Sequence, residues 1–275
     1  MLLTLLFFVT ALFPCIIGAM SGVGGGIIMK PLLDLIASGA FTGDFPGGGS
    51  LGVKEINFLS GCTVLTMSVV SLLRGRKNGI RIDNRRGFAL AAGAAAGGIA
   101  GKMIFSFAVR TADKNMVGAI QSSILILMTI CVIFYIWKKG SIAKKDLKHL
   151  PLCAALGLGL GLVSAFLGIG GGPINIMAIS YFLSMDAKTS ALHSLFIIFL
   201  SQLASFIMTL VEGIPPAPMT ALAAMISGGV TGAVIGSYLV RLLRNEQVEK
   251  LFNIFMMVVI ALSLYNLANF IRAGL

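Results

Sequence analysis

Charged residues are scarce in this chain of 275 residues. They make up 11% of the sequence, and ten of them are acidic, whereas soluble domains carry charge on roughly a quarter of their residues. In contrast, 57% of the residues are hydrophobic and the mean hydropathy is +0.98. No polar stretch is long enough to form a soluble domain. We therefore expect a single membrane domain over 1–275.

The sequence also lacks the motifs of redox, metal and nucleotide chemistry. Its four cysteines lie in or beside apolar stretches, and no two have the CxxC spacing of a thiol relay or a cysteine metal site. A dinucleotide fingerprint would need glycine where Ile27 and Pro173 stand. The stretch ending in Gly101-Lys102 lacks the first glycine and the Ser/Thr of a P-loop. We therefore expect no metal, no cofactor, no ATP-driven step and no enzymatic activity.

Apolar stretches of about twenty residues recur, and each is long enough to cross about 30 Å of hydrocarbon as a helix. They do not alternate as β-strands of a barrel would. The first of them has the hydrophobicity of a secretory signal but no basic n-region, so we interpret it as a span. Spanning helices are predicted over 1–19, 54–73, 87–109, 116–137, 151–167, 188–211, 219–240 and 251–271.

Basic residues collect in three short connections. Six lie between 74 and 86, five between 138 and 148, and three between 241 and 250. Connections of this kind face the cytoplasm under the positive-inside rule. The formal charge of +11 therefore indicates topology rather than nucleic-acid binding.

Two glycine runs, at 22–26 and 168–172, each separate two apolar stretches. Glycine costs roughly 1 kcal/mol in a helix interior relative to alanine, so three in a row predict a break. The segments that follow, 27–37 and 173–183, are too short to cross a bilayer unaided. We expect broken or re-entrant helices here, which membranes tolerate where protein or a polar cavity receives the freed backbone groups.

The chain reads as two copies of one unit. Gly22 matches Gly168 at an offset of 146, and the glycine pair at 98 and 101 matches the pair at 229 and 232 at an offset of 131. The copies, about 1–140 and 148–275, contain five membrane segments each. The basic connection 74–86 corresponds to 212–218, which has no basic residue, whereas the near-neutral turn 110–114 corresponds to the basic 241–250. The copies are therefore predicted to be inverted, with both termini outside.

A helix that begins inside the membrane directs unpaired N–H groups and the positive end of its dipole at an anion. The alternative is that the glycines only permit close helix packing. The recurrence of the run at matched positions favours a binding site. Our candidate substrate-binding residues are the glycines and the intramembrane polar residues nearest them: Gly24, Gly25, Gly26, Lys30, Gly170, Gly171, Gly172, Asn175, Asn57, Ser60, Lys102 and Gln202.

Intramembrane ionisable residues are costly and therefore point to function. Lys30 follows the first run by four residues; it could instead pair with Asp34 at i,i+4 or extend to the inner surface. Lys102 could meet the anion or be interfacial. His193, about one turn into its span, is our candidate for a coupling proton, with a hydrogen-bonded structural role as the alternative.

The stretch 22–33, Gly-Val-Gly-Gly-Gly-Ile-Ile-Met-Lys-Pro-Leu-Leu, resembles the first signature of the TauE/SafE sulfite-exporter family. The stretch 168–179 resembles its second, and 97–101 and 228–232 are similar to its later small-residue helices. The resemblance implies transport of sulfite or organosulfonates such as sulfoacetate across the cytoplasmic membrane. Two departures concern the substrate: Met177 stands opposite Pro31, and Lys30 occupies a position that is usually apolar, which suggests additional negative charge on the substrate.

We thus expect a secondary transporter of a small anion in the inner membrane, proton-coupled and working by alternating access. A passive anion channel, a transporter of a non-sulfur carboxylate, and a scaffold protein are the alternatives. The expected partners are the substrate and the lipid bilayer, with no nucleic acid and with a homodimer as one possible assembly.

Overall fold

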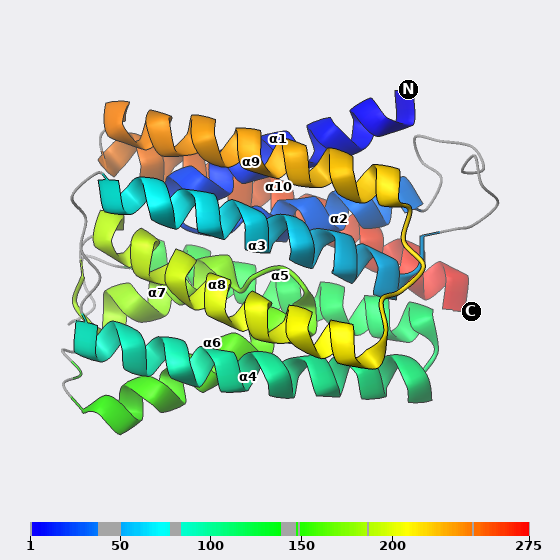
Figure 1. Cartoon of the computed structure of the whole chain (residues 1–275), viewed down its shortest axis with the longest axis horizontal. Helices are drawn as coiled ribbons and strands as arrows, with labels where there is room; N and C mark the ends of the chain where they lie inside the picture. Colours follow the sequence, from blue (N-terminus) through cyan, green and yellow to red (C-terminus); the bar gives the residue numbers. More distant parts are fainter. Residues whose placement is uncertain are drawn as a thin grey trace.

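The computed structural model of the chain describes residues 2–37, 51–77, 84–138, 147, 149–185, 187–243 and 245–274. Regular structure in these residues is all helical, and eight of the helices are long and apolar enough to span a membrane, as predicted (Figure 1). The short exceptions are α2 and α7. The elements are α1 (Leu2–Ser21), α2 (Gly26–Ala37), α3 (Val53–Lys77), α4 (Asn84–Thr111), α5 (Lys114–Lys138), α6 (Leu150–Leu167), α7 (Gly172–Phe182), α8 (Ala187–Glu212), α9 (Met219–Leu242) and α10 (Asn245–Gly274).

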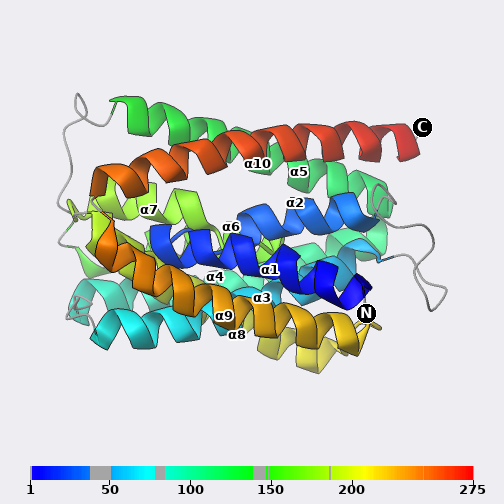
Figure 2. The same ribbon diagram turned by 90° about the horizontal axis from the view of Figure 1, so that it is seen from above.

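Both predicted breaks are confirmed. The first run separates α1 from α2, and the second separates α6 from α7. Gly22 and Gly168, the first residues after α1 and α6, adopt φ values of 74° and 67°, a left-handed conformation that ends a helix and that a side chain would strain. After the first break the chain turns back along α1, since a Cβ on Gly25 would lie 2.9 Å from the carbonyl carbon of Pro14. Figure 2 shows α2 returning toward the end of the bundle at which α1 begins.

Both termini lie at one end of the helix bundle (Figure 1). Helices α3, α5 and α9 finish at the opposite end, where α4, α6 and α10 start. That opposite end carries basic side chains, among them Arg74, Arg76, Lys138 and Arg241. The predicted 74–86 and 138–148 connections lie largely outside the described residues.

The prediction of a ten-residue basic loop over 241–250 is wrong. α9 continues to Leu242 and α10 starts at Asn245, so most of this stretch is helical. Basic side chains there occupy the last turn of one helix and the first turns of the next. Long basic side chains at such ends reach polar surroundings without ending the helix.

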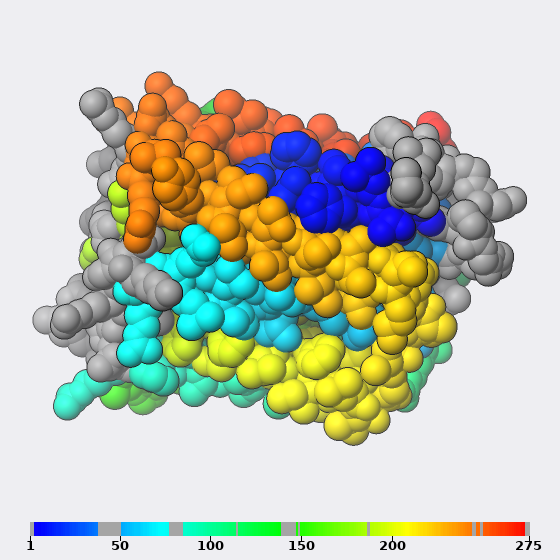
Figure 3. Space-filling view, turned by 45° about the horizontal axis from the view of Figure 1, so that its top comes forward, coloured from blue at the N-terminus to red at the C-terminus, as the bar shows by residue number. Residues whose placement is uncertain are grey.

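Stripes of small residues let two helix pairs pack closely. A Cβ on Gly97 or Gly101 of α4 would collide with the carbonyls of α6 at Leu158 or Leu162. Three glycines of α9, at 228, 232 and 236, face the backbone of α1 in the same way. Figure 3 shows α1 lying directly against α9 at the surface. These glycines thus serve close packing, as small residues commonly do between membrane helices.

The two breaks contact each other at the centre of the fold. A Cβ on Gly26 would overlap the carbonyl of Ile169, and a Cβ on Gly172 would overlap the carbonyl of Val23. Each break therefore packs its backbone against the other, with no space for a side chain between them. The α1–α2 hairpin and the α6–α7 hairpin are joined at this crossing.

The crossing gives a prediction for stability. Gly172→Ala should lower the free energy of unfolding by about 1–3 kcal/mol or prevent folding, because the new methyl group meets a backbone that cannot move aside. The readout is the melting temperature and folded yield in detergent.

Gly159→Ala is the matched control in the preceding helix α6. No atom lies within 4 Å of the added Cβ, and replacing a helical glycine can stabilise by up to about 1 kcal/mol. Equal melting temperatures for the two variants would contradict a close contact at the crossing.

Candidate functional site

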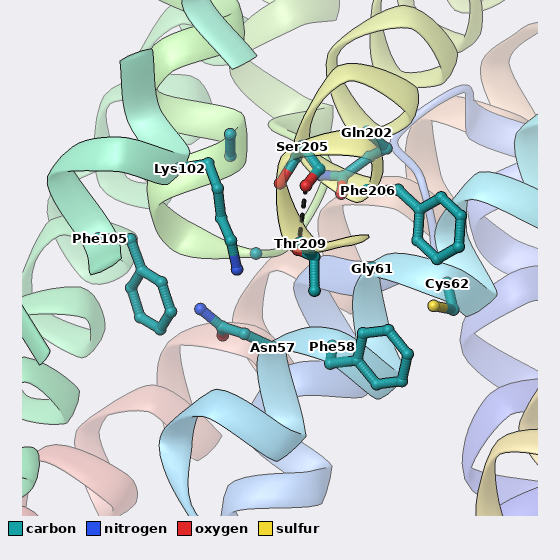
Figure 4. A pocket seen from close by; sticks show the side chains of 12 residues that line it. Asn57, Phe58, Gly61, Cys62, Lys102, Phe105, Gln202, Ser205, Phe206 and Thr209 are labelled. Carbon is teal, nitrogen blue, oxygen red and sulfur yellow. Dashed lines mark hydrogen bonds between the residues drawn. The ribbon is translucent and has the colours of Figure 1, made fainter. Parts of the chain in front are cut away.

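A pocket lies between α3, α4, α6 and α8, and we call it the α3–α8 pocket (Figure 4). It encloses about 360 Å³ of empty space, including the part that is open to solvent. Gly168, the first glycine of the second break, forms part of its wall. The lining residues are Asn57, Phe58, Gly61, Cys62, Lys102, Phe105, Ala165, Gly168, Gln202, Ser205, Phe206 and Thr209.

Hydrogen-bond donors converge on this pocket. Figure 4 shows the ammonium group of Lys102 and the side-chain amide of Asn57 directed toward the same space. The Nε2 group of Gln202 is buried and has no hydrogen-bond partner, and neither has Oδ1 of Asn57. Lys102 is the one charged residue among the twelve described lining residues. A positive charge beside the unpartnered Nε2 group of Gln202 suits a small anion, because a buried donor without an acceptor costs free energy until a ligand supplies one; Oδ1 of Asn57 is an acceptor and would need a donor instead.

Lys102 has two kinds of neighbour. Its Nζ lies 5.3 Å from the centroid of the Phe105 ring, within range of a cation–π contact. The carboxylate of Glu212, at the end of α8, interacts with it electrostatically, and Ser106 Oγ donates to Glu212 Oε2 at 2.6 Å. The carboxylate of Glu212 thus partly balances the positive charge of Lys102. The ammonium group of Lys102 is directed into the pocket, where it can meet a ligand.

An aromatic wall closes one side of the pocket. Phe58 of α3 and Phe206 of α8 stack with centroids 6.5 Å apart and planes 17° from parallel. Neither residue stands out in the sequence, because a phenylalanine in an apolar helix is ordinary. Their spacing was the available signal, since Phe206 follows Gln202 by four residues and therefore shares its helix face.

Ser60 supports the wall formed by the second break. Its Oγ donates to the carbonyl of Gly168 at 3.1 Å. A Cβ on Gly168 would come within 2.7 Å of Cγ of Asn57, so the glycine makes room for that amide. Three of the predicted site residues, Asn57, Lys102 and Gln202, therefore meet in one pocket, and Ser60 holds part of its backbone.

The remaining glycine candidates lie behind this wall. Gly24, Gly25, Gly26, Gly170, Gly171 and Gly172 are absent from the described lining of the α3–α8 pocket. The N–H of Gly25 donates to Sδ of Met67 at 3.4 Å, and the crossing contacts described above occupy Gly26 and Gly172. These glycines shape and pack the two breaks.

Asn175 lies in the first turn of α7 beside Gly171. It is fully buried, and both of its side-chain polar atoms lack a hydrogen-bond partner. Ser164 Oγ, also near Gly171, lies 3.4 Å from Ser201 Oγ. Ser201 precedes Gln202, so polar side chains continue inward from the pocket toward α7.

Lys30 lies in a second pocket, which we call the α2–α5 pocket. The empty space in this pocket is about 220 Å³, including the part that is open to solvent. Lys30 Nζ donates to Oε1 of Gln121, whose Nε2 in turn donates to the carbonyl of Phe166 at 2.6 Å. The lining residues are Lys30, Pro31, Asp34, Gln121, Ser122, Leu125, Leu167 and Ile169. Lys30 and Lys102 thus belong to different pockets, on either side of the second break.

His193 is buried in α8, and its Nδ1 lies 2.9 Å from the carbonyl of Thr189 in the same helix. It is absent from the described lining of either pocket. Among the described residues, no group of three or more His, Cys, Asp or Glu side chains is arranged to hold a metal ion.

Comparison with known families gives one match. The family model described as Sulfite exporter TauE/SafE matches residues 6–264, which include both breaks and both pockets. No curated protein and no solved structure matches the chain.

The unpartnered amide of Gln202 gives a prediction for stability. Gln202→Leu should raise the melting temperature of the ligand-free protein, because it removes a buried donor whose missing partner costs about 1–3 kcal/mol. The measurement is thermal unfolding in detergent.

Gln121→Leu is the matched control, since the bonded amide of Gln121 holds both Lys30 and the Phe166 carbonyl. Its loss should lower the melting temperature. A destabilised Gln202→Leu variant would show that this amide is satisfied and that its role is structural.

Proposed function

The chain belongs to the sulfite exporter TauE/SafE family, a family of membrane transporters, and on this premise we propose that it moves a small sulfur-containing anion across the cytoplasmic membrane. Sulfite or an organosulfonate such as sulfoacetate is the proposed substrate. The observation that carries the proposal is the α3–α8 pocket, in which Lys102 is the one charged residue of the described lining and lies beside the unpartnered amide donor of Gln202.

The chemistry of this pocket suits a sulfur oxyanion. Sulfite and sulfonate groups present three oxygens, and Lys102, Gln202 and Asn57 can each donate to one. Hydrogen bonds from charged donors are the stronger ones, and the protein interior strengthens them further. The stacked rings of Phe58 and Phe206 would pack against the carbon part of an organosulfonate.

We propose alternating access between two inverted repeats, about 1–140 and 148–275. Reciprocal contacts support this pairing: Gly26 faces Ile169, and Gly172 faces Val23. The repeat offset of 146 relates the two contacts: adding it to Gly26 gives Gly172, and subtracting it from Ile169 gives Val23. The packing of α4 on α6 and of α9 on α1 is reciprocal in the same sense. Inverted repeats built around broken helices are typical of secondary transporters.

The proposed orientation follows from charge. With the basic end of the bundle in the cytoplasm, both termini lie outside the inner membrane. Asn57 lies near the start of α3 and Thr209 near the end of α8, and both helix ends are on the side of the termini. The pocket would then be reached from outside, with the crossing of the breaks on its inner side. We further propose that transport is coupled to a proton, for which the sequence alone suggests His193.

Transport by purified protein in proteoliposomes tests the anion site. Lys102→Met should raise the KM for sulfite or sulfoacetate counterflow at least about tenfold, because it removes a charge interaction of about 1.4 kcal/mol or more. Lys138→Met is the matched control: this lysine also lies over a phenylalanine ring, at 4.8 Å from the centroid, but is exposed at the end of α5. Unchanged counterflow by the Lys102 variant would remove the proposed site.

The substrate class is tested by thermal shift against sulfite, thiosulfate, sulfoacetate, taurine and simple carboxylates. We expect stabilisation by sulfur oxyanions that is lost in Lys102→Met. Stabilisation by carboxylates alone would reassign the substrate, and flux without saturation or counterflow would identify a passive channel. No shift and no flux with any of these anions would favour a scaffold.

The orientation is tested by reporter fusions in bacterial cells. Alkaline phosphatase, which is active outside the cytoplasm, should be active when fused after residue 275 and inactive when inserted between 78 and 83. A C-terminal green fluorescent protein that fluoresces would contradict termini on the outside.

A further inference from the structure

We propose that Asp34 is the residue that takes up the coupling proton, in the α2–α5 pocket and outside the anion pocket. The inference rests on the proposed transport function and assigns its coupling step to a side chain and a place. It concerns a carboxylate that the family match does not single out and that the sequence pattern suggested only as a partner for Lys30.

The position of Asp34 is that of an ion-binding group. Its side chain is 9% exposed, lines the α2–α5 pocket, and has an Oδ1 atom with no hydrogen-bond partner. Lys30, one turn earlier on α2, is 4% exposed, and its ammonium group is bound by Gln121. A buried carboxylate oxygen without a partner carries a large desolvation cost, which a bound proton removes.

The surroundings of Asp34 leave Lys30 as its charged neighbour. Helix α5 contributes the neutral Gln121 and Ser122 to the pocket. α10 contributes Asn266, whose amide donates to the carbonyl of Pro31 at 2.9 Å. The helices on the other side of α2 pack against it with apolar residues such as Phe7 and Ile56. Among the described lining residues, the charge of the pocket is therefore set by Lys30 and by whether Asp34 holds a proton.

Proton uptake changes the net charge beside the anion site. With Asp34 ionised, its negative charge balances Lys30; with a proton on one carboxylate oxygen, Lys30 remains as an uncompensated positive charge. The second break lies between the two pockets: Gly168 lines the α3–α8 pocket and the next residue, Ile169, lines the α2–α5 pocket. In a low-dielectric interior, an uncompensated charge on Lys30 would act across this wall on an anion in the α3–α8 pocket.

Protonation of Asp34 should therefore favour anion binding, and anion binding should favour protonation, since such coupling is reciprocal. The two ions would cross together. The step forms one O–H bond on Asp34 from a proton of the medium and breaks none in the protein; the same proton leaves on the other side. His193 differs from Asp34 in that its Nδ1 contacts a carbonyl of its own helix and in that it is absent from the described lining of both pockets.

The test uses the full-length protein in proteoliposomes, with sulfoacetate as the probe because it stays fully ionised near neutral pH. Two quantities are measured: sulfoacetate exchange at equal pH on both sides, and sulfoacetate-driven proton entry reported by a pH-sensitive dye inside the vesicles. Asp34→Asn should keep exchange within about threefold of the wild type while proton entry and accumulation driven by a pH gradient fall to background. Asp34→Glu should restore both.

Three comparisons separate this role from others. Asp113→Asn, at an exposed turn, should change neither measurement. His193→Gln should retain proton entry; its loss there, with retention in Asp34→Asn, would move the coupling proton to His193. The double variant Lys30→Met/Asp34→Leu removes both charges of the pocket. It should exchange anions without proton entry, whereas recovery of proton entry would show that Asp34 only balances Lys30.

The failure of the inference is distinct from the failure of the proposed function. If the wild type exchanges neither sulfoacetate nor sulfite, the transport proposal fails, and the coupling proposal fails with it. If the wild type exchanges sulfoacetate and Asp34→Asn still shows proton entry, the assignment to Asp34 alone is overturned.

Discussion

The contact of two broken helices, backbone against backbone, is the constraint on which the rest of this structure depends. Gly26 and Gly172 each lie against a carbonyl of the opposite break, at a separation that no side chain permits. Because lipid cannot satisfy free backbone groups, a break in a membrane helix must be covered by protein. Here each break covers the other. This contact also fixes the two pockets, since both are partly walled by the residues of the second break.

Much of the fold could be predicted because it depends on the lengths of the apolar stretches and on the positions of the glycine runs that interrupt them. Runs of apolar residues give the spans, and triple glycine gives the breaks, whatever the neighbouring helices are. The sequence misplaces the end of α9 and the start of α10, because a cluster of basic residues is also typical of a loop. A side chain as long as that of Arg241 can stay in a helix and still reach polar surroundings. Charge in the sequence therefore locates a membrane surface better than it locates a helix end.

The candidate site could be predicted only in part, because a single sequence does not state which way an apolar helix is turned. Asn57, Lys102 and Gln202 were found as rare polar residues, and they converge. The separation of Lys30 from Lys102 depends on how α2 and α4 are placed about the second break, which no spacing along the chain reveals. Gln121 carried the same signal as Gln202, an amide within a span, and could have been found by it.

The short connection between α9 and α10 has a mechanical consequence. α9 packs along α1, and α10 follows α9 almost at once and reaches α2 through the bond from Asn266 to the Pro31 carbonyl. Together α1, α2, α9 and α10 close a ring of contacts, and α10 also packs along α5. The hydrogen bond from Lys30 to Gln121 ties α2 of this ring to α5 as well. Under the coupling proposed above, a change of charge at Asp34 would act one helical turn from this bond, on the helix that joins the ring to α5.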